Sequence, residues 1–300
     1  MGTAAVIETD RLTKRYGTAR GIEDVSLAVR PGEVFGFLGP NGAGKTTTIR
    51  TLLDLLHPTS GTARLFGLDS RRDSRAIRAR VGNLPGDFSY DPRMTGEDLL
   101  HLVLSARGTG DMRGAQALAG RFEADLSRRL GELSRGNRQK IGLIQALVHE
   151  PELLVLDEPS SGLDPLMQEE FLTVVAEQRE RGATVFLSSH ELDEVQRACD
   201  RVGIIREGRL VAVEEVAEMR GRAYRSVAVR FAAPVDPAEF ARIPGVEGLE
   251  ADGAWLRFRV RGDLDPVVKA TARHEVRDLE LTRPTLEELF LTYYRGGNGR

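Results

Sequence analysis

A glycine-rich segment that ends in lysine and two threonines constrains the fold of this chain more than any other feature. It reads Gly39-Pro40-Asn41-Gly42-Ala43-Gly44-Lys45-Thr46-Thr47. The apolar run 33–38 before it predicts a strand, and the pattern after it predicts a helix that extends to about residue 56. A strand, a GxxxxGK[ST] turn and a helix in this order are typical of an α/β protein with a phosphate loop.

A phosphate loop has a defined chemistry, and the residues of this segment can supply it. Its glycines let backbone N–H groups converge on the β- and γ-phosphates of a nucleotide. Lys45 neutralises charge on those phosphates, and the hydroxyl of Thr46 can ligate Mg²⁺. The alternative is a glycine-rich turn with an accidental lysine, and the flanking strand and helix argue against it. We therefore expect residues 39–47 to bind a nucleotide together with Mg²⁺.

An apolar run that ends in two acidic residues predicts the second part of the site. The run is Leu153-Leu154-Val155-Leu156-Asp157, followed by Glu158. Parallel strands end at one edge of a sheet, so Asp157 is expected beside the phosphate loop, where it can hold Mg²⁺ through water. Glu158 is then placed to polarise the attacking water. A buried strand can also end in an acidic residue that only caps it, and the presence of the phosphate loop decides for the catalytic interpretation.

With these motifs, residues 6–215 resemble the ATP-binding-cassette ATPases, and four further segments match that family's order of motifs. Leu133-Ser134-Arg135-Gly136-Asn137 resembles the family signature, about 20 residues before the acidic strand. The segment Ser161-Gly162-Leu163-Asp164 resembles the loop through which two subunits of a dimer communicate. His190 matches the switch histidine, and Tyr16 occupies the place of the aromatic residue that stacks on adenine.

The resemblance implies how the site is completed. Ser134 is expected to begin a helix that runs to about residue 148, and its hydroxyl and the N–H groups near Gly136 would form an anion site. In the family this site closes over the γ-phosphate bound to the other subunit of a head-to-tail homodimer. The resemblance further implies ATP as the nucleotide, an integral-membrane permease as partner and a peripheral position on the cytoplasmic face of the membrane. Bacterial drug and polysaccharide exporters are the most similar subfamily.

Two departures from the family pattern leave part of this interpretation open. Gly86 stands where a glutamine or glutamate usually supplies a side chain to the metal and water, and Asp87 could substitute from the next position. The signature has Arg135 and Asn137 where glycine and glutamine are usual. Because of Gly86, one alternative function stays open, which is a regulator that binds nucleotide but seldom hydrolyses it. A second alternative is a cassette ATPase that works on nucleic acid or ribosomes without a transporter.

Composition narrows the possible partners. The formal charge of −3 provides no positive field to attract nucleic acid, so no nucleic acid is expected as a ligand. Cys199 is the only cysteine, which excludes an internal disulfide and a zinc site of several thiolates. No apolar run approaches the roughly 20 residues of a membrane span. If the protein acts at a membrane, it must therefore do so through a partner protein.

The hydrophobic periodicity predicts two domains. Residues 1–221 alternate strand and helix patterns, which is typical of an α/β domain with a P-loop NTPase core, and residues 96–150 read as a helical subdomain inserted into it. Residues 222–300 predict a small C-terminal α+β domain of the order βαββαβ with an accessory role. A closing helix is predicted from Thr285, with a capping box to Glu288 and an apolar stripe.

Overall fold

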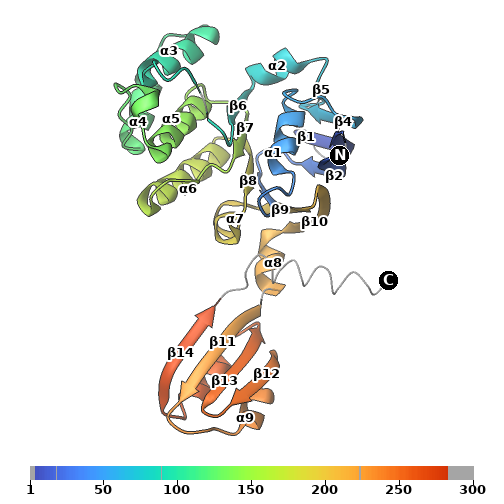
Figure 1. Cartoon of the computed structure of the whole chain (residues 1–300), viewed down its shortest axis with the longest axis vertical. Coiled ribbons are helices and arrows are strands. Elements are labelled where there is room, and N and C mark those ends of the chain that lie inside the picture. The colour runs from blue at the N-terminus through green and yellow to red at the C-terminus, as the bar shows by residue number, and fades with distance from the viewer. Residues whose placement is uncertain (1–3, 18, 89, 223, 283–300) are drawn as a thin grey trace. The chain divides into compact units, whose positions relative to one another are not determined.

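The computed structural model describes residues 4–17, 19–88, 90–222 and 224–282, which form two compact units divided between Glu214 and Glu215 (Figure 1). The sequence prediction placed this division seven residues later, after residue 221. The difference is helix α8 (Val216–Arg222), which belongs by its contacts to the C-terminal unit. The two units are described separately.

The first unit is built on a six-stranded sheet of order β10-β9-β3-β8-β7-β6. Strands β3 (Val34–Leu38), β8 (Thr184–Ser189) and β7 (Leu153–Asp157) form its centre, pair in parallel and are buried along their whole length. Strands buried on both faces form continuous apolar runs, and for that reason the runs predicted at 33–38 and 153–157 agree with β3 and β7 within one residue at each end. The outer strands are β6 (Val81–Leu84), β9 (Arg201–Arg206) and β10 (Arg209–Glu215).

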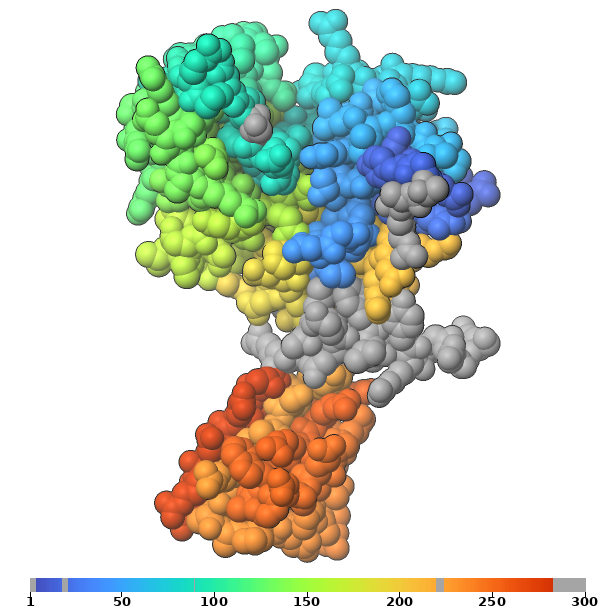
Figure 2. Space-filling view, in the orientation of Figure 1, coloured from blue at the N-terminus to red at the C-terminus, as the bar shows by residue number. Residues whose placement is uncertain are grey.

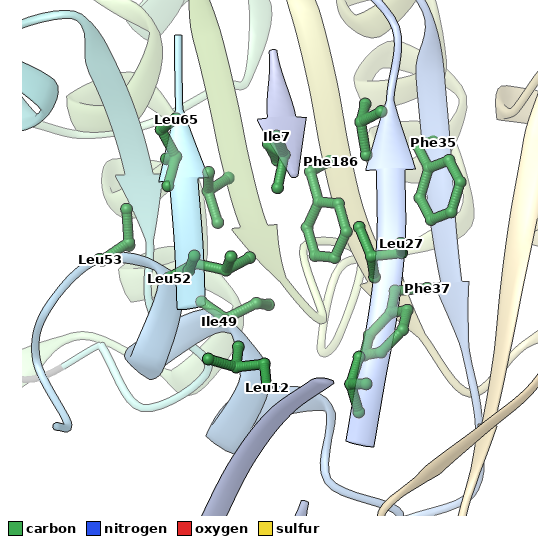
Figure 3. Packing of buried hydrophobic residues seen from close by; sticks show 14 of the residues in the cluster. Ile7, Leu12, Leu27, Phe35, Phe37, Ile49, Leu52, Leu53, Leu65 and Phe186 are labelled. Atoms are coloured by element: carbon green, nitrogen blue, oxygen red, sulfur yellow. The ribbon is translucent and has the colours of Figure 1, made fainter. Parts of the chain in front are cut away.

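A smaller antiparallel sheet of order β2-β1-β4-β5 packs over helix α1 (Lys45–Leu52) and the central sheet. Its strands are β1 (Ile7–Tyr16), β2 (Ala19–Val29), β4 (Ser60–Leu65) and β5 (Leu68–Asp69). Figure 3 shows the core between them, where Phe35 stacks on Phe186 with ring centroids 5.8 Å apart and Ile49 of α1 lies next to Leu52 in the same cluster. This apolar contact fixes α1 and, with it, the loop at its N-terminus.

Helix α1 (Lys45–Leu52) is shorter than predicted. The sequence pattern extended it to about residue 56, but Asp54 has a left-handed φ of 56°, and the N–H groups of Leu55 and Leu56 both bond to Arg50 O at 2.8 and 3.1 Å. A residue in this conformation ends a helix by turning the chain back over the last carbonyl groups.

A lobe of helices stands beside the sheets, drawn in green in Figures 1 and 2. Residues 96–150, all of them described, contain α3 (Gly96–Ala106), α4 (Arg113–Arg121), the 3₁₀ turn η1 (Leu130–Glu132) and α5 (Arg135–Leu147), and no strand. Thr95 and Asp98 form a capping box at the N-terminus of α3. The remaining helices of this unit are α2 (Ser74–Ala79), α6 (Pro165–Glu180), which Asp164 caps, and α7 (Leu192–Ala198).

The C-terminal unit has the predicted βαββαβ order as far as Thr282. Its strands are β11 (Tyr224–Phe231), β12 (Val246–Asp252), β13 (Trp255–Arg261) and β14 (Val276–Thr282), in the antiparallel order β12-β13-β11-β14. Helices α9 (Pro237–Ala241) and α10 (Asp265–Thr271) contribute Phe240 and Val267 to its core. The helix predicted from Thr285 lies outside the described residues. Within the described ranges, no helix combines the length and apolar composition that crossing a bilayer requires.

His149 makes the stability of the first unit depend on pH. Burial, with the positive charge of Arg107 nearby, lowers the pKa of its imidazole to about 4, and its Nε2 lies 3.3 Å from Val81 O. Because the unfolded chain binds this proton from about pH 6.5 downward and the folded chain does not, stability falls as the pH drops from 6.5 to 4. The loss should be no more than about 2 kcal/mol, since the ring is only partly buried. In urea titrations at pH 7 and pH 5, His149→Gln should reduce the difference in unfolding free energy; an unchanged difference would contradict this account.

Candidate functional site

The phosphate loop connects the carboxyl end of β3 to α1. Gly42 and Gly44 have φ values of 79° and 110°, which favour glycine, and Gly44 is the N-cap of α1. A Cβ on Gly39 would come within 2.4 Å of Ile205 O, so the loop starts in close contact with β9. Gly39 N–H also donates to Ser189 O at 3.1 Å. These contacts hold the loop at the edge where β3, β8 and β9 end.

Lys45 lies beneath this loop with its ammonium group fully engaged. The side chain is 5% exposed, and Nζ donates to Gly39 O at 2.6 Å and to Pro40 O at 3.3 Å. Its third contact is an ion pair with Glu158 Oε1 at 2.9 Å. A buried cation needs several such partners, because an unpaired charge in the interior is very costly. Lys45 is therefore held at the point where the phosphate loop faces the acidic strand.

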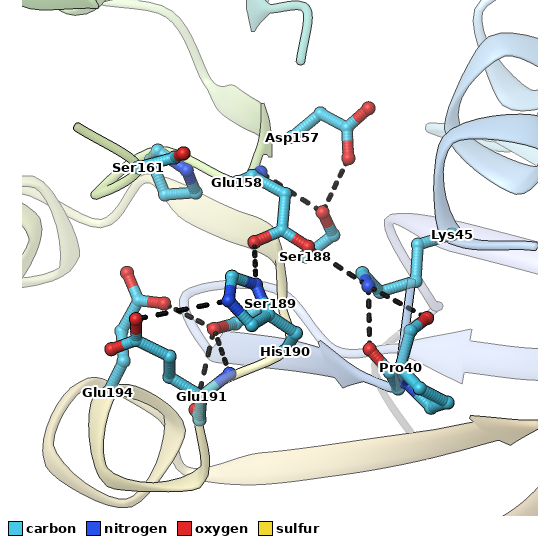
Figure 4. A network of polar contacts seen from close by, with 12 residues as sticks. Pro40, Lys45, Asp157, Glu158, Ser161, Ser188, Ser189, His190, Glu191 and Glu194 are labelled. Carbon is cyan, nitrogen blue, oxygen red and sulfur yellow. Dashed lines mark hydrogen bonds and ion pairs between the residues drawn. The ribbon is translucent and has the colours of Figure 1, made fainter. Parts of the chain in front are cut away.

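The acidic residues and the histidine form one network with Lys45 (Figure 4). Ser188 Oγ donates to Asp157 Oδ1 at 2.5 Å and accepts the N–H of Glu158 at 3.1 Å. Glu158 has a left-handed φ of 52°, which turns its carboxylate out of the strand direction. Its Oε2 lies 2.6 Å from His190 Nδ1, so one carboxylate bridges Lys45 and His190. The lysine of the phosphate loop, the acidic residues after β7 and the histidine after β8 therefore meet at the carboxyl edge of the sheet.

The oxygen donors at this edge fit a magnesium ion. Asp157 is 1% exposed, with Oδ1 held by Ser188 and Oδ2 facing the loop after β6. A Cβ built on Gly86 would lie 2.9 Å from Oδ2, so this carboxylate oxygen occupies the space that a larger residue would fill. Mg²⁺ is commonly bound by one carboxylate, a hydroxyl, waters and substrate phosphates. Asp157 and Thr46 match this donor set, whereas Gly86 contributes no side chain.

The contact between Gly86 and Asp157 predicts an effect for a small substitution. Gly86→Ala should lower steady-state phosphate release roughly 10-fold, because the added methyl group displaces a buried carboxylate that Ser188 holds in place. Gly110→Ala is the matched control, since a Cβ there meets no atom within 4 Å. Parental activity of Gly86→Ala would show that the Asp157 position tolerates the methyl group.

The signature-like turn packs against the loop 161–164 of the same chain. Ser134 is the N-cap of α5 and accepts the N–H of Asn137 at 3.3 Å, and the helix ends at Leu147, one residue before the predicted end. A Cβ on Gly136 would lie 2.3 Å from Gly162 O, so only glycine allows this approach. Arg135 Nη2 donates to Ser161 Oγ at 3.0 Å. The unusual arginine of the signature thus fastens the two segments together.

A residue that the sequence analysis missed links α5 to the acidic strand. Gln139, which is 6% exposed, donates from Nε2 to Glu158 O at 3.1 Å and to Pro159 O at 3.0 Å. Asp164 caps α6 by accepting the N–H of Met167 at 3.1 Å and lies 4.0 Å from Lys140 Nζ. The position of Gln139 shortly after the signature was the only sequence signal for this contact. A polar residue at that spacing is equally typical of an exposed helix position, so the sequence alone did not identify it.

Tyr16 and the predicted residues of the signature turn and the dimer loop stand apart from the network. Tyr16 ends β1 with 43% of its surface exposed, and Lys14 Nζ lies 5.4 Å from its ring centroid. Within the described part of the chain, neither Tyr16 nor Ser134 bonds to Lys45, Asp157 or Glu158. The structure therefore brings the phosphate loop, the acidic residues and His190 together, and leaves the signature turn as a separate surface.

Comparison with known proteins identifies relatives of this chain. The sequence profile of the family described as ABC transporter matches residues 22–161. A bacitracin transport ATP-binding protein of Enterococcus faecalis is 36% identical over 220 residues, which are 72% of this chain and 71% of that protein. The chain belongs to the ABC transporter ATP-binding proteins. A Nod factor export ATP-binding protein of Paraburkholderia xenovorans is 40% identical and covers 69% of this chain and 70% of its own length.

Solved structures agree with the fold of this ABC transporter ATP-binding protein. The ATP-binding subunit of an ABC transporter superposes with a TM-score of 0.65 at 31% identity, over 72% of this chain and 92% of that one. A dimeric cassette in a post-hydrolysis state bound to ADP and Pi has a TM-score of 0.64 at 21% identity, over 70% and 98%, which supports the fold alone. The predicted α/β fold with a P-loop NTPase core is confirmed.

Family membership also establishes the general activity. The chain is an ATPase and the nucleotide-binding subunit of an ABC transporter. Since the proteins of this family belong to membrane transporters, the chain is a membrane-associated component.

Proposed function

We propose that this protein hydrolyses ATP at two composite sites of a homodimer and drives export through a separate membrane permease. The observation that carries the proposal is the bridge that Glu158 forms between Lys45 and His190 at the carboxyl edge of the sheet. A lysine, a carboxylate and an imidazole in mutual contact beside a phosphate loop are suited to phosphoryl transfer to water.

Each residue of the network has a distinct task in this proposal. The N–H groups of residues 39–47 and the ammonium of Lys45 bind the β- and γ-phosphates, and Tyr16 stacks on adenine. Asp157 and Thr46 would hold Mg²⁺, which neutralises charge on the phosphates when bound. Glu158 accepts a proton from the water that attacks the γ-phosphorus, while the bond from that phosphorus to the β–γ bridging oxygen breaks and ADP leaves. His190, in contact with Glu158 Oε2, orients this carboxylate and reaches the γ-phosphate.

The second half of each site comes from the partner subunit in this proposal. The Ser134 hydroxyl and the N-terminus of α5, a helix of 13 residues, offer donors to an anion. We place this surface against the γ-phosphate bound by the partner, with Asp164 at the dimer loop. Loss of the γ-phosphate then removes the bridge, and the dimer opens. The contacts of Arg135 with Ser161 and of Gln139 with Glu158 O connect this surface to the chain's own hydrolytic residues.

Mixing two inactive variants tests the composite site. Lys45→Ala removes the phosphate cation, and Ser134→Arg blocks the signature turn. In a mixed dimer of the two, both defects fall in one site and the other site is intact, so mixing should restore up to about one quarter of parental phosphate release. Each variant alone should be inactive. If mixtures stay inactive although mixed dimers are isolated with two affinity tags, the sites are not shared between subunits.

The export role rests on similarity to a bacitracin transport protein and a Nod factor export protein. We propose that the dimer lies on the cytoplasmic face of the membrane and that its permease selects the cargo. Affinity purification of the tagged chain from detergent-solubilised membranes should recover a polytopic membrane protein that changes the rate of phosphate release. Recovery of tightly bound, salt-sensitive nucleic acid in its place would contradict the transport role.

A further inference from the structure

A buried glutamate lies behind the hydrolytic network and is not part of any motif described above. Glu194 is in the first turn of α7 and is 8% exposed. Its Oε2 accepts a hydrogen bond from the hydroxyl of Ser189, the last residue of β8. Burying a carboxyl group is costly unless its hydrogen bonds compensate, so a position like this one needs an explanation.

Ser189 connects Glu194 to the loop that carries the histidine. Its hydroxyl also accepts the N–H of Glu191 at 2.9 Å, which closes a turn around His190. Its carbonyl oxygen accepts the N–H of Gly39 at the start of the phosphate loop. The backbone on both sides of His190 is thus held by one serine, and Glu194 fixes the hydroxyl of that serine.

The other side of Glu194 faces the loop that follows Glu158. Ser160, 9% exposed and two residues beyond Glu158, lies close enough to the carboxyl group to lower its pKa, although its hydroxyl makes no direct hydrogen bond to the buried Oε1. Figure 4 shows Glu194 on one side of Ser189 with His190 and Glu158 on the other. Glu194 therefore bonds to Ser189, which precedes the histidine, and lies close to Ser160, which follows the catalytic carboxylate by two residues.

We propose that Glu194 is a positioning residue for ATP hydrolysis, which holds Ser189 so that His190 Nδ1 meets Glu158 Oε2. This role rests on the proposed hydrolytic function of Glu158 and His190. The two serines at the end of β8 have different partners. Ser188 bonds to Asp157 and Glu158. Ser189 bonds to Glu194 and thereby holds the turn around His190.

Burial and nearby groups act in opposite directions on the pKa of the Glu194 carboxyl group. Burial raises this pKa, the contacts with Ser189 and Ser160 lower it in part, and the negative charges of Glu158 and Glu191 raise it further. The carboxyl group supplies an acceptor for the Ser189 hydroxyl. Glutamine provides the same acceptor without charge and should replace Glu194 in this task.

Steady-state phosphate release by purified variants tests the proposal. Glu194→Ala should lower kcat about 10- to 100-fold, because small displacements of catalytic groups have effects of this size. The KM for ATP and the melting temperature should stay close to the parental values. Glu194→Gln should keep kcat within about threefold of the parent, since the amide retains the acceptor. Glu180→Ala, an exposed glutamate on α6, is the matched control.

A double-mutant cycle separates positioning from a general structural role. If Glu194 acts through His190, Glu194→Ala should change kcat by no more than roughly twofold in a His190→Ala background, because the contact it supports is already lost. Additive effects, parental kcat of Glu194→Ala, or failure of glutamine to restore kcat would each overturn the proposal. An inactive parent protein would instead refute the proposed hydrolytic function.

Discussion

Lys45→Ala is expected to weaken binding of ATP by at least about 100-fold. Charge-assisted hydrogen bonds contribute about 1.5–3 kcal/mol each, and the ammonium group can direct more than one of them to the phosphates. Alanine leaves a triphosphate facing only the neutral N–H dipoles of the phosphate loop. Equilibrium titration with a fluorescent ATP analogue measures the change directly, and its size makes it easy to detect.

Lys269→Ala is the matched control for this substitution, because Lys269 is an exposed lysine in the C-terminal unit that pairs with Asp265 at 2.7 Å. Its affinity for the analogue should equal that of the parent. Lys45→Ala also removes the ion pair to Glu158, so circular dichroism must first show that the variant is folded. If a folded Lys45→Ala protein bound the analogue with parental affinity, Lys45 and its loop would not be the binding site for the phosphates.

Glu158→Gln is expected to reduce hydrolysis about 10²- to 10⁴-fold, the usual contribution of a general base. Glutamine has the same shape and can occupy the left-handed backbone conformation that Glu158 adopts, with φ of 52°. Nucleotide binding should persist, because the phosphate loop and Asp157 are unchanged. The ATP-bound protein should then accumulate as a dimer, which size-exclusion chromatography with ATP and Mg²⁺ detects.

The comparison for this variant is Glu180→Gln, an exposed substitution of the same type on α6. It should hydrolyse ATP at the parental rate and show no ATP-dependent dimer beyond that of the parent. Phosphate release by Glu158→Gln at the rate of this control would mean that another group accepts the proton from water. The bridge between Lys45 and His190 would then have a structural role only.

Much of the fold was predictable because local residue patterns reflect burial. The three central strands are continuous apolar runs, and Asp164-Pro165 marks the start of a helix by cap chemistry that acts within one turn. The helix after the phosphate loop was predicted too long, because its apolar pattern continues past Leu52 while the backbone reverses at Asp54. Local patterns report which residues can be buried, and a turn imposed by the surrounding packing overrides them.

Part of the site was equally predictable. Asp157, Glu158 and His190 lie at strand ends, and Lys45 begins the helix that follows the phosphate loop. Parallel strands bring their ends to one edge. The contact of Gly86 with Asp157 and the buried positions of Gln139 and Glu194 were not predictable. Their partners lie on other elements, and each residue type reads as an exposed or neutral position in the sequence.

By itself, the sequence determined the order of the strands and helices, the phosphate loop and the chemical groups at the strand ends, because these depend on residues close together in the chain. Only the tertiary structure decided which groups touch. It placed Glu158 between Lys45 and His190, packed Gly136 against Gly162 O, and buried Glu194 beside Ser189. The physical reason is that such contacts join residues from different strands and loops, and their distances are set by how the sheet and helices pack.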